Sequence, residues 1–159
     1  MNRWQTGDII VRDAVEADVH ALKDRLREKD KQEILATFAP SVECALADAF
    51  ERSAMVYTIE RAGVPVAMFG VEPETILSPA AVVWFLGADE MKSIKKAFLR
   101  GTRFFLDKFL DRYPLLFNIV DARYTETIRW LKAFGAKFEE PKPFGPQGQP
   151  FAFFTLRRA

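Results

Sequence analysis

The chain has 159 residues, of which 49% are hydrophobic and 15 are phenylalanine. This length and this apolar content are typical of a single domain with one core, so we expect residues 1–159 to form one domain. The 23 Lys and Arg nearly balance the 22 Asp and Glu. That balance argues against a nucleic-acid-binding protein that relies on net charge, and we expect no nucleic-acid partner.

Cysteine and histidine occur once each, as Cys44 and His20. A single cysteine cannot form an intrachain disulfide, which suits a reducing compartment. A single histidine excludes a multi-histidine metal site, and we expect no metal. His20 lies in "EADVHALKDRL", which has the pattern of a surface helix, so a solvated histidine is favoured over a catalytic base.

The N-terminal "MNRWQTGDII" lacks the apolar run of a signal peptide. No apolar stretch approaches the roughly 18 residues that suggest a membrane span. We therefore expect a soluble protein in the cytoplasm, without a membrane partner.

In the first half, alternation predicts a strand over 8–14, followed by a helix over about 16–28. The stretch 29–53 predicts one or two further helices broken near Pro40, with Ser41 as an N-cap. "MVYTIE" and "VPVAMFGVE" then flank Arg-Ala-Gly, which predicts a β-hairpin with glycine in its turn.

In the second half, the apolar run "AAVVWFLGAD" predicts a strand buried on both faces. The longest helix follows over 91–112 and ends before Pro114. "LLFNIVDA" predicts the next buried strand, parallel to the first through a right-handed crossover. The tail predicts two strands across a loop rich in Pro and Gly. The expected class is α+β, with a mixed, mostly antiparallel sheet and helices on both faces.

"VDARYTETIRWLKAFGAKFEE", residues 120–140, predicts the end of a strand, a turn, an amphipathic helix and the start of another strand. Thr125 fits the N-cap, and Gly135 fits a left-handed stop. Judged by its physics alone, this is an ordinary core helix.

This unit resembles the last conserved unit of the GNAT (Gcn5-related N-acetyltransferase) superfamily, and the element order of the chain agrees. With "PKPFGPQGQPFAFF", "VVWFLGADE" and "KKAFLR", it is more similar still to GNAT-like and internal virion proteins of tailed phages. The similarity covers about 80–155, whereas residues 1–79 agree by element order.

The resemblance implies acetyl-CoA as cofactor. Its thioester would lie against the splayed strand "VVWFLG", and its pyrophosphate would lie at the start of the long helix, at "KSIKKA". Cofactor binding is thereby assigned to Leu86, Gly87, Lys92, Ser93, Lys95, Lys96 and Ala97.

The expected pyrophosphate-binding segment "KSIKKA" departs from the family pattern, because Ser93 and Lys95 stand where glycines are usual. Its lysines could neutralise phosphate as point charges. Alternatively, four basic residues form a solvated stripe opposite the apolar face of the helix, which is the interpretation we favour. These residues are Lys92, Lys96, Arg100 and Arg103.

The catalytic positions also depart from the family. The tyrosine common four residues before the helix-ending glycine is Leu131, which has no proton to donate. Tyr124 is a candidate displaced acid, although a turn tyrosine packed on the sheet is favoured. A general base would be Glu72, Asp89 or Glu90, and for each of these a structural role is favoured.

Two functions follow from the resemblance. The first is a phage N-acetyltransferase acting on an unknown amine, and the second is a catalytically degenerate virion or host-interaction protein. Exposed aromatics of "KPFGPQGQPFAFF" would be the contact surface in the second case. Nucleic-acid binding by the basic stripe of 91–112 ranks third, because one stripe on a near-neutral protein usually serves solvation. The expected location is the host cytoplasm or a phage virion, and the oligomeric state is left open.

Overall fold

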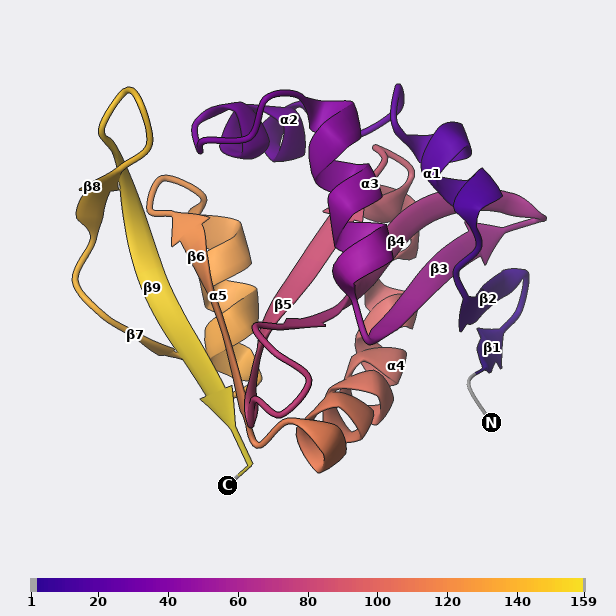
Figure 1. The fold of residues 1–159 in the computed structure, drawn as a ribbon. Coiled ribbons are helices and arrows are strands. Elements are labelled where there is room, and N and C mark those ends of the chain that lie inside the picture. Colours follow the sequence, from indigo (N-terminus) through magenta and orange to yellow (C-terminus); the bar gives the residue numbers. More distant parts are fainter. Residues whose placement is uncertain (1–2, 159) are drawn as a thin grey trace.

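The computed structural model describes residues 3–158 (Figure 1). Its helices are α1 (Glu16–Leu22), α2 (Glu28–Leu35), α3 (Val42–Arg52), α4 (Met91–Arg112) and α5 (Thr125–Ala133). Its strands are β1 (Trp4–Thr6), β2 (Ile9–Asp13), β3 (Met55–Arg61), β4 (Val64–Pro73), β5 (Ala80–Gly87), β6 (Leu115–Asp121), β7 (Lys137–Phe138), β8 (Lys142–Phe144) and β9 (Gln149–Arg157).

The described strands form one sheet in the order β1-β2-β3-β4-β5-β6-β9-β7, with β8 also paired to β9. Within it β5 and β6 are parallel, and the other neighbouring pairs are antiparallel. The predicted α+β class, mixed sheet and parallel crossover through α4 are therefore confirmed.

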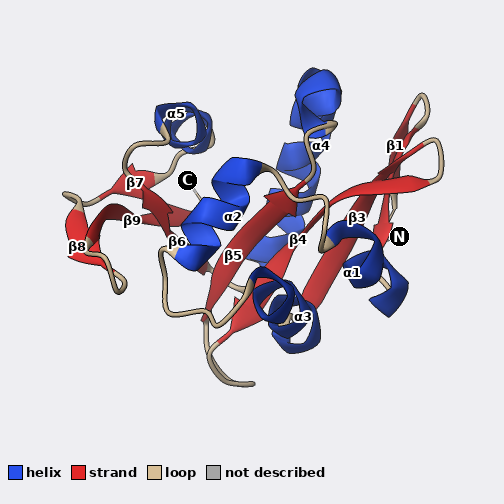
Figure 2. Ribbon diagram, turned by 90° about the horizontal axis from the view of Figure 1, so that it is seen from above, coloured by secondary structure: helices blue, strands red, loops and turns tan. Residues whose placement is uncertain are grey.

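Helices cover both faces of this sheet, as Figure 2 shows. On one face α4 and α5 bury an aromatic-rich core against the strands, with Phe98, Phe105 and Phe109 of α4 at most 5% exposed. On the other face α1 and α3 bury a smaller cluster that includes Leu22 and Leu46. The apolar face of the helix predicted over 91–112 thus packs against the sheet in the larger of the two cores.

The N-terminal helices differ from the sequence prediction. The helix expected over 16–28 ends at Leu22, and α2 begins only at Glu28. Between them Leu26, which is 4% exposed, leaves the helix and pairs with Ala88 beyond β5. Burial of Leu26 and this bridge outweigh continuation of the helix. The predicted N-cap is confirmed, since the Ser41 hydroxyl accepts the N–H of Cys44 at 3.1 Å.

The predicted hairpin is confirmed as β3 and β4, whose turn places Ala62 and Gly63 at φ of +50° and +80°. Gly135 lies at φ +94°, the left-handed stop that was predicted. The N-cap of α5 is Tyr124 rather than Thr125, and it makes no side-chain cap hydrogen bond. None of the helices formed by residues 3–158 has the length and hydrophobicity that a membrane span requires.

β5 and β6 pair only over their first residues, from Ala80↔Leu115 to Val82↔Phe117. Beyond these pairs the strands diverge towards α2, which crosses above the opening (Figure 1). We call this divergence the splay. β5 was expected to be buried on both faces, but its residues from Val82 to Leu86 are half-buried because the splay removes the neighbouring strand.

Candidate functional site

The splay contains an apolar cleft of about 330 Å³. Both wings of the splay contribute to it, through Val83–Leu86 of β5 and Asn118–Val120 of β6. From the α4–α5 face it is lined by Phe98, Thr102, Phe105, Trp130, Leu131 and Phe134. From the opposite face it is lined by Glu33, Ile34, Thr37, Ala45 and Ala49. Among these residues Glu33 is the one charged side chain.

At the narrow end of the cleft, Asn118 joins the two strands with its side chain. Its Nδ2 donates to the carbonyl oxygen of Val83 on β5 at 2.7 Å, and its Oδ1 accepts the N–H of Ile119 on β6 at 2.7 Å. The amide thereby replaces the backbone bonds that end at Phe117.

At the wide end of the cleft, α2 supplies partners for β5. The Asp30 carboxylate accepts the N–H of Gly87 at 3.0 Å, and the N–H of Arg27 donates to the carbonyl of Gly87 at 2.8 Å. Asp30 is 7% exposed, and the Arg27 guanidinium donates to it from Nε at 2.8 Å. This buried carboxylate is therefore both paired and hydrogen-bonded, as burial of a charge requires.

Glu33, one turn further along α2, supplies a partner for β6. Its Oε2 accepts the N–H of Asp121 at 2.9 Å. Burial raises the pKa of the Glu33 carboxyl to about 7; the hydrogen bond from Asp121 opposes this rise, and the charges of Asp30 and Asp121 add to it. The cleft thus contains a carboxyl group that gains or loses a proton near neutral pH.

One residue of β5 that faces the splay lacks a hydrogen-bond partner on that side in the described part of the chain. Because ladder bonds alternate along a strand, the N–H and C=O groups of Val83, Phe85 and Gly87 face the splay. Asn118 and α2 serve Val83 and Gly87. Within residues 3–158, Phe85 finds no hydrogen-bond partner on that side.

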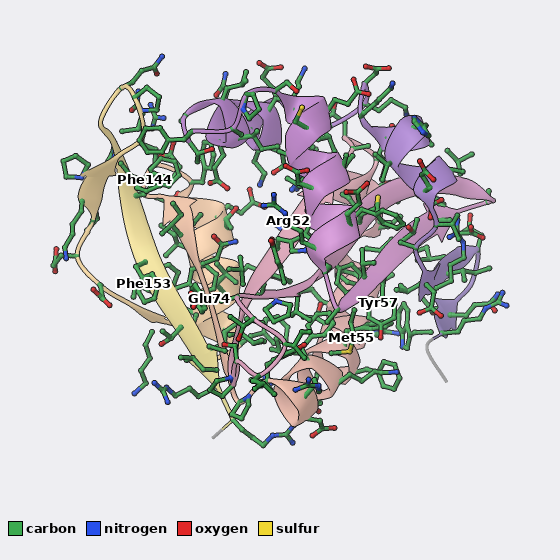
Figure 3. The ribbon with its side chains drawn as sticks, viewed as in Figure 1. Arg52, Met55, Tyr57, Glu74, Phe144 and Phe153 are labelled. Carbon is green, nitrogen blue, oxygen red and sulfur yellow. The ribbon has the colours of Figure 1, made fainter. Side chains whose placement is uncertain are left out.

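Several contacts fix α2 over the splay. The Tyr124 hydroxyl donates to the carbonyl of Lys29 at 3.2 Å, and Lys29 Nζ donates to the Thr127 hydroxyl at 3.3 Å. Just beyond the end of α2, the ring of Phe38 packs edge-on against Phe144 of β8, with centroids 5.6 Å apart. Figure 3 shows Phe144 on this C-terminal hairpin. α2 thus connects both wings of the splay with α5 and the hairpin.

The first turn of α4, where the resemblance places pyrophosphate, is occupied by contacts within the chain. Its N-cap residue is Glu90, which forms an ion pair with Arg25. The Ser93 hydroxyl donates to the carbonyl of Glu90 at 2.8 Å and accepts from Arg61 at 2.7 Å. Lys95 pairs with Glu126 at the start of α5. The N–H groups of Met91, Lys92 and Ser93, which a phosphate at this helix N-terminus would need, already donate to the carbonyls of the residues three positions earlier, each at 3.1 Å.

The predicted site residues do not converge on the cleft. Leu86 lines it, and Gly87 lies at its wide end. Glu72 instead lies near Arg52 and Asp48 of α3; burial raises its pKa, Arg52 opposes the rise and Asp48 adds to it. The other candidates lie around the first turns of α4 and α5: Glu90, Lys92, Ser93, Lys95, Lys96, Ala97 and Tyr124.

The Tyr124 hydroxyl contacts α2, whereas the sequence favoured a tyrosine packed on the sheet. Its pKa is raised, first by burial and then by the nearby charge of Asp121. In the described part of the chain no three metal-ligating side chains come together.

Sequence reasoning missed the residues that fill the splay: Asp30, Glu33 and Asn118. The stretch "REKDKQE" has the pattern of a solvated helix, and nothing in it shows that alternate turns face a sheet. The expected divergence of the two strands was the available signal. Diverging strands leave backbone N–H and C=O groups unpaired, and polar side chains are then needed as their partners.

The fold is that of the GNAT-family acetyltransferases. A GCN5-related N-acetyltransferase from Kribbella flavida superposes with a TM-score of 0.68 at 14% identity, over 95% of this chain and 98% of its own. The Salmonella typhimurium protein yncA, whose structure contains its cofactor acetyl-CoA, superposes with a TM-score of 0.65 at 14% identity, over 95% of this chain and 94% of its own. At these identities the similarity establishes the fold alone.

The sequence comparison narrows the class to one family. Residues 56–141 match the family described as "Bacteriophage T7, probable scaffold protein Gp13". The probable scaffold protein gp13 of Escherichia phage T7 is 29% identical over 130 residues, which cover 79% of this chain and 84% of the relative. The chain belongs to this phage family.

Proposed function

We propose that the chain is a non-catalytic assembly protein of a tailed phage, which keeps the acetyltransferase fold as a rigid support and does not use acetyl-CoA. The observation that carries this proposal is the position of α2. Its Asp30 and Arg27 occupy the backbone groups of Gly87, and its Glu33 occupies that of Asp121. The T7 relative is a probable scaffold protein, which supports the same proposal.

The first argument concerns the pantetheine arm of CoA, which carries two amide groups that need backbone partners in an apolar cleft. β5 offers three residues that face the splay, and Val83 and Gly87 already have partners. Phe85 alone could pair with a ligand there. Binding of the arm would therefore require α2 or Asn118 to give up existing hydrogen bonds.

The second argument concerns the pyrophosphate. Its negative charge would lie next to Glu90, whose carboxylate is paired with Arg25, and Lys95, one of the lysines assigned to the phosphate, is paired with Glu126. Like charges at short distance oppose binding. The third argument concerns catalysis: Leu131 lines the cleft where the family's acid would stand, and it cannot donate a proton.

An assembly protein needs an exposed contact surface, and three apolar side chains next to α2 supply one. Leu35 is 55% exposed, Phe38 is 72% exposed and Phe144 is 39% exposed. Phe38 and Phe144 touch each other, so these two aromatic side chains form one patch. This patch includes the C-terminal loop that the sequence indicated as a contact surface.

The test has two parts. The thermal midpoint of the purified chain is measured with and without millimolar acetyl-CoA, and we expect no shift. A ligand at about one hundred times its dissociation constant would add roughly 2.7 kcal/mol, or several degrees for a domain of this size. In a phage that encodes the chain, Phe38→Ser should lower particle yield, whereas Glu72→Gln should leave it unchanged. A clear midpoint shift with acetyl-CoA would refute the proposal.

Acetyl transfer is the second candidate, and one observation favours it. The Glu33 carboxyl lies in an apolar cleft, and burial raises its pKa to about 7, which suits a general base for an amine. This function would require α2 to move, because Glu33 already accepts the N–H of Asp121. Turnover of acetyl-CoA that disappears in Glu33→Gln would establish it.

A further inference from the structure

The exposed sides of α4 and α5 carry a concentration of basic residues. Between Met91 and Leu106, α4 contains five Lys and Arg and no Asp or Glu. α5 adds Arg129 and Lys132, both exposed. We call this region the α4–α5 surface, and it consists of Lys92, Lys95, Lys96, Arg100, Arg103, Arg129 and Lys132.

Two contacts show that α4 and α5 lie side by side. Lys95 pairs with Glu126 near the starts of the helices, and the Arg103 guanidinium lies 5.2 Å from the ring centroid of Phe134 at the end of α5. The two pairs have the same separation along the chain, so α4 and α5 run parallel. Figure 2 shows both helices on the same face of the sheet.

Little negative charge offsets this surface. Glu126 lies within it, and the pKa of Glu126 is held below its usual range by the hydrogen bond from Lys95, with Lys29 and Arg129 adding to the effect. Asp107 and Asp111 lie beyond its far end, and Asp111 pairs with Arg158. The whole chain has a formal charge of only +1, so this surface is more positive than the chain as a whole.

We propose that the α4–α5 surface binds the phosphate backbone of nucleic acid without regard to sequence. A single stripe of lysines would be explained by solvation, but here a second helix widens the stripe into a face. Along α4, Lys92 and Arg103 are about 16 Å apart at roughly 1.5 Å per residue. That length matches several successive phosphates of a strand.

Nucleic acid suits this surface better than an acidic protein does. Protein interfaces are built around buried apolar and aromatic anchors. The most exposed large apolar side chains, Ile76, Leu77 and Phe38, lie on other elements. Phe104, 40% exposed, flanks the surface next to Arg103 and could stack on a base. Phosphate contacts by Lys and Arg require no apolar anchor.

The test measures binding of the full chain to a fluorescent single-stranded and a fluorescent duplex oligonucleotide, by anisotropy at several salt concentrations. The test variant is Lys96→Gln/Arg100→Gln/Arg129→Gln. The matched control is Lys23→Gln/Lys31→Gln/Lys142→Gln, which changes the net charge equally on other surfaces. All six side chains are at least partly exposed, so both proteins should fold, as thermal midpoints will verify.

We expect the wild type to bind more weakly as salt rises, with a log–log slope of about one per phosphate contact. The test variant should lose about tenfold or more in affinity at low salt and about two to three in slope, and the control should retain both. Absence of binding at low salt, or equal losses in the two variants, would overturn the proposal. So would competition by polyglutamate as effective as that by nucleic acid, because it would indicate an acidic protein as the ligand.

Discussion

The carboxylate of Asp30 lies at the end of β5, where it accepts the N–H of Gly87 at 3.0 Å. A side chain of α2 thus does what a neighbouring strand does elsewhere in the sheet. The Arg27 guanidinium donates to the same carboxylate from Nε and Nη2. The wide end of the splay is closed by these charge-assisted hydrogen bonds.

Replacing Asp30 by Ala should therefore destabilise the chain. The substitution leaves the N–H of Gly87 without an acceptor, which costs about 1–3 kcal/mol. That corresponds to a fall of several degrees in the thermal midpoint, at about 2–4 °C per kcal/mol. Asp30→Asn keeps an acceptor oxygen and is the control, so it should fall less. Equal stability of Asp30→Ala and the wild type in urea would show that α2 does not close the splay.

Glu33 should make stability depend on pH in the neutral range. Burial raises its folded-state pKa to about 7 from the ordinary glutamate value of 4.5. The stabilisation that comes from holding the Glu33 carboxyl in its protonated form is fully present below the unfolded-state pKa. It is lost as the pH rises through the folded-state pKa. Stability should thus fall between about pH 4.5 and 7, by roughly 3 kcal/mol at most.

Glu33→Gln is the matched variant, because its amide oxygen can still accept the N–H of Asp121 but carries no titrating proton. We expect it to lack this pH-dependent loss and to exceed the wild type in stability at pH 8. Urea unfolding at several pH values measures both effects. Parallel curves for the two proteins would show that Glu33 titrates at an ordinary pKa.

More of the fold than of the candidate site could be predicted from the sequence. Periodicity located the hairpin of β3 and β4 and the long α4, because each has a local pattern of apolar and turn residues. The ends of α1 and the start of α2 could not be predicted, since they depend on Leu26 pairing with Ala88, more than sixty residues away. The roles of Asp30 and Glu33 depend on the splay, which is also a long-range property.

Gly145 sets the contact between the C-terminal hairpin and α2. A Cβ at this position would lie 1.8 Å from the carbonyl oxygen of Ala36, and its φ of +82° disfavours other residues. Gly145→Ala should therefore push the hairpin away from α2. Gly148→Ala is the control, because its φ of +65° imposes similar strain but its nearest atom, in Pro143, is 4.0 Å away.

Both glycine variants should lose about 1–2 kcal/mol from left-handed strain, and Gly145→Ala should lose measurably more. Hydrogen exchange should also rise around residues 34–38 in that variant alone. If the two variants proved equally stable and equally protected, the hairpin would not be held against α2.

Asp18 should dominate the acid limb of the stability curve. It is 3% exposed, and it accepts hydrogen bonds from Arg12, from the Thr58 hydroxyl at 2.7 Å and from the N–H of Val15 at 2.9 Å. Burial raises its pKa, but these hydrogen bonds and the charge of Arg12 outweigh burial, so the pKa lies below its usual value. Its contribution is present above the unfolded pKa of about 3.9 and is lost as pH falls through the folded pKa.

Asp18→Asn keeps the shape of the side chain and removes this titration. It should be less stable than the wild type at pH 7 by about 1–3 kcal/mol, because an amide cannot replace the charge-assisted bonds to Arg12. Between pH 5 and pH 2, roughly the range in which carboxylates gain protons, its urea midpoint should fall less steeply than that of the wild type. An acid slope that Asp18→Asn leaves unchanged would assign acid unfolding to other carboxylates, with Asp121 next in line because its hydrogen bonds from Arg123 also lower its pKa.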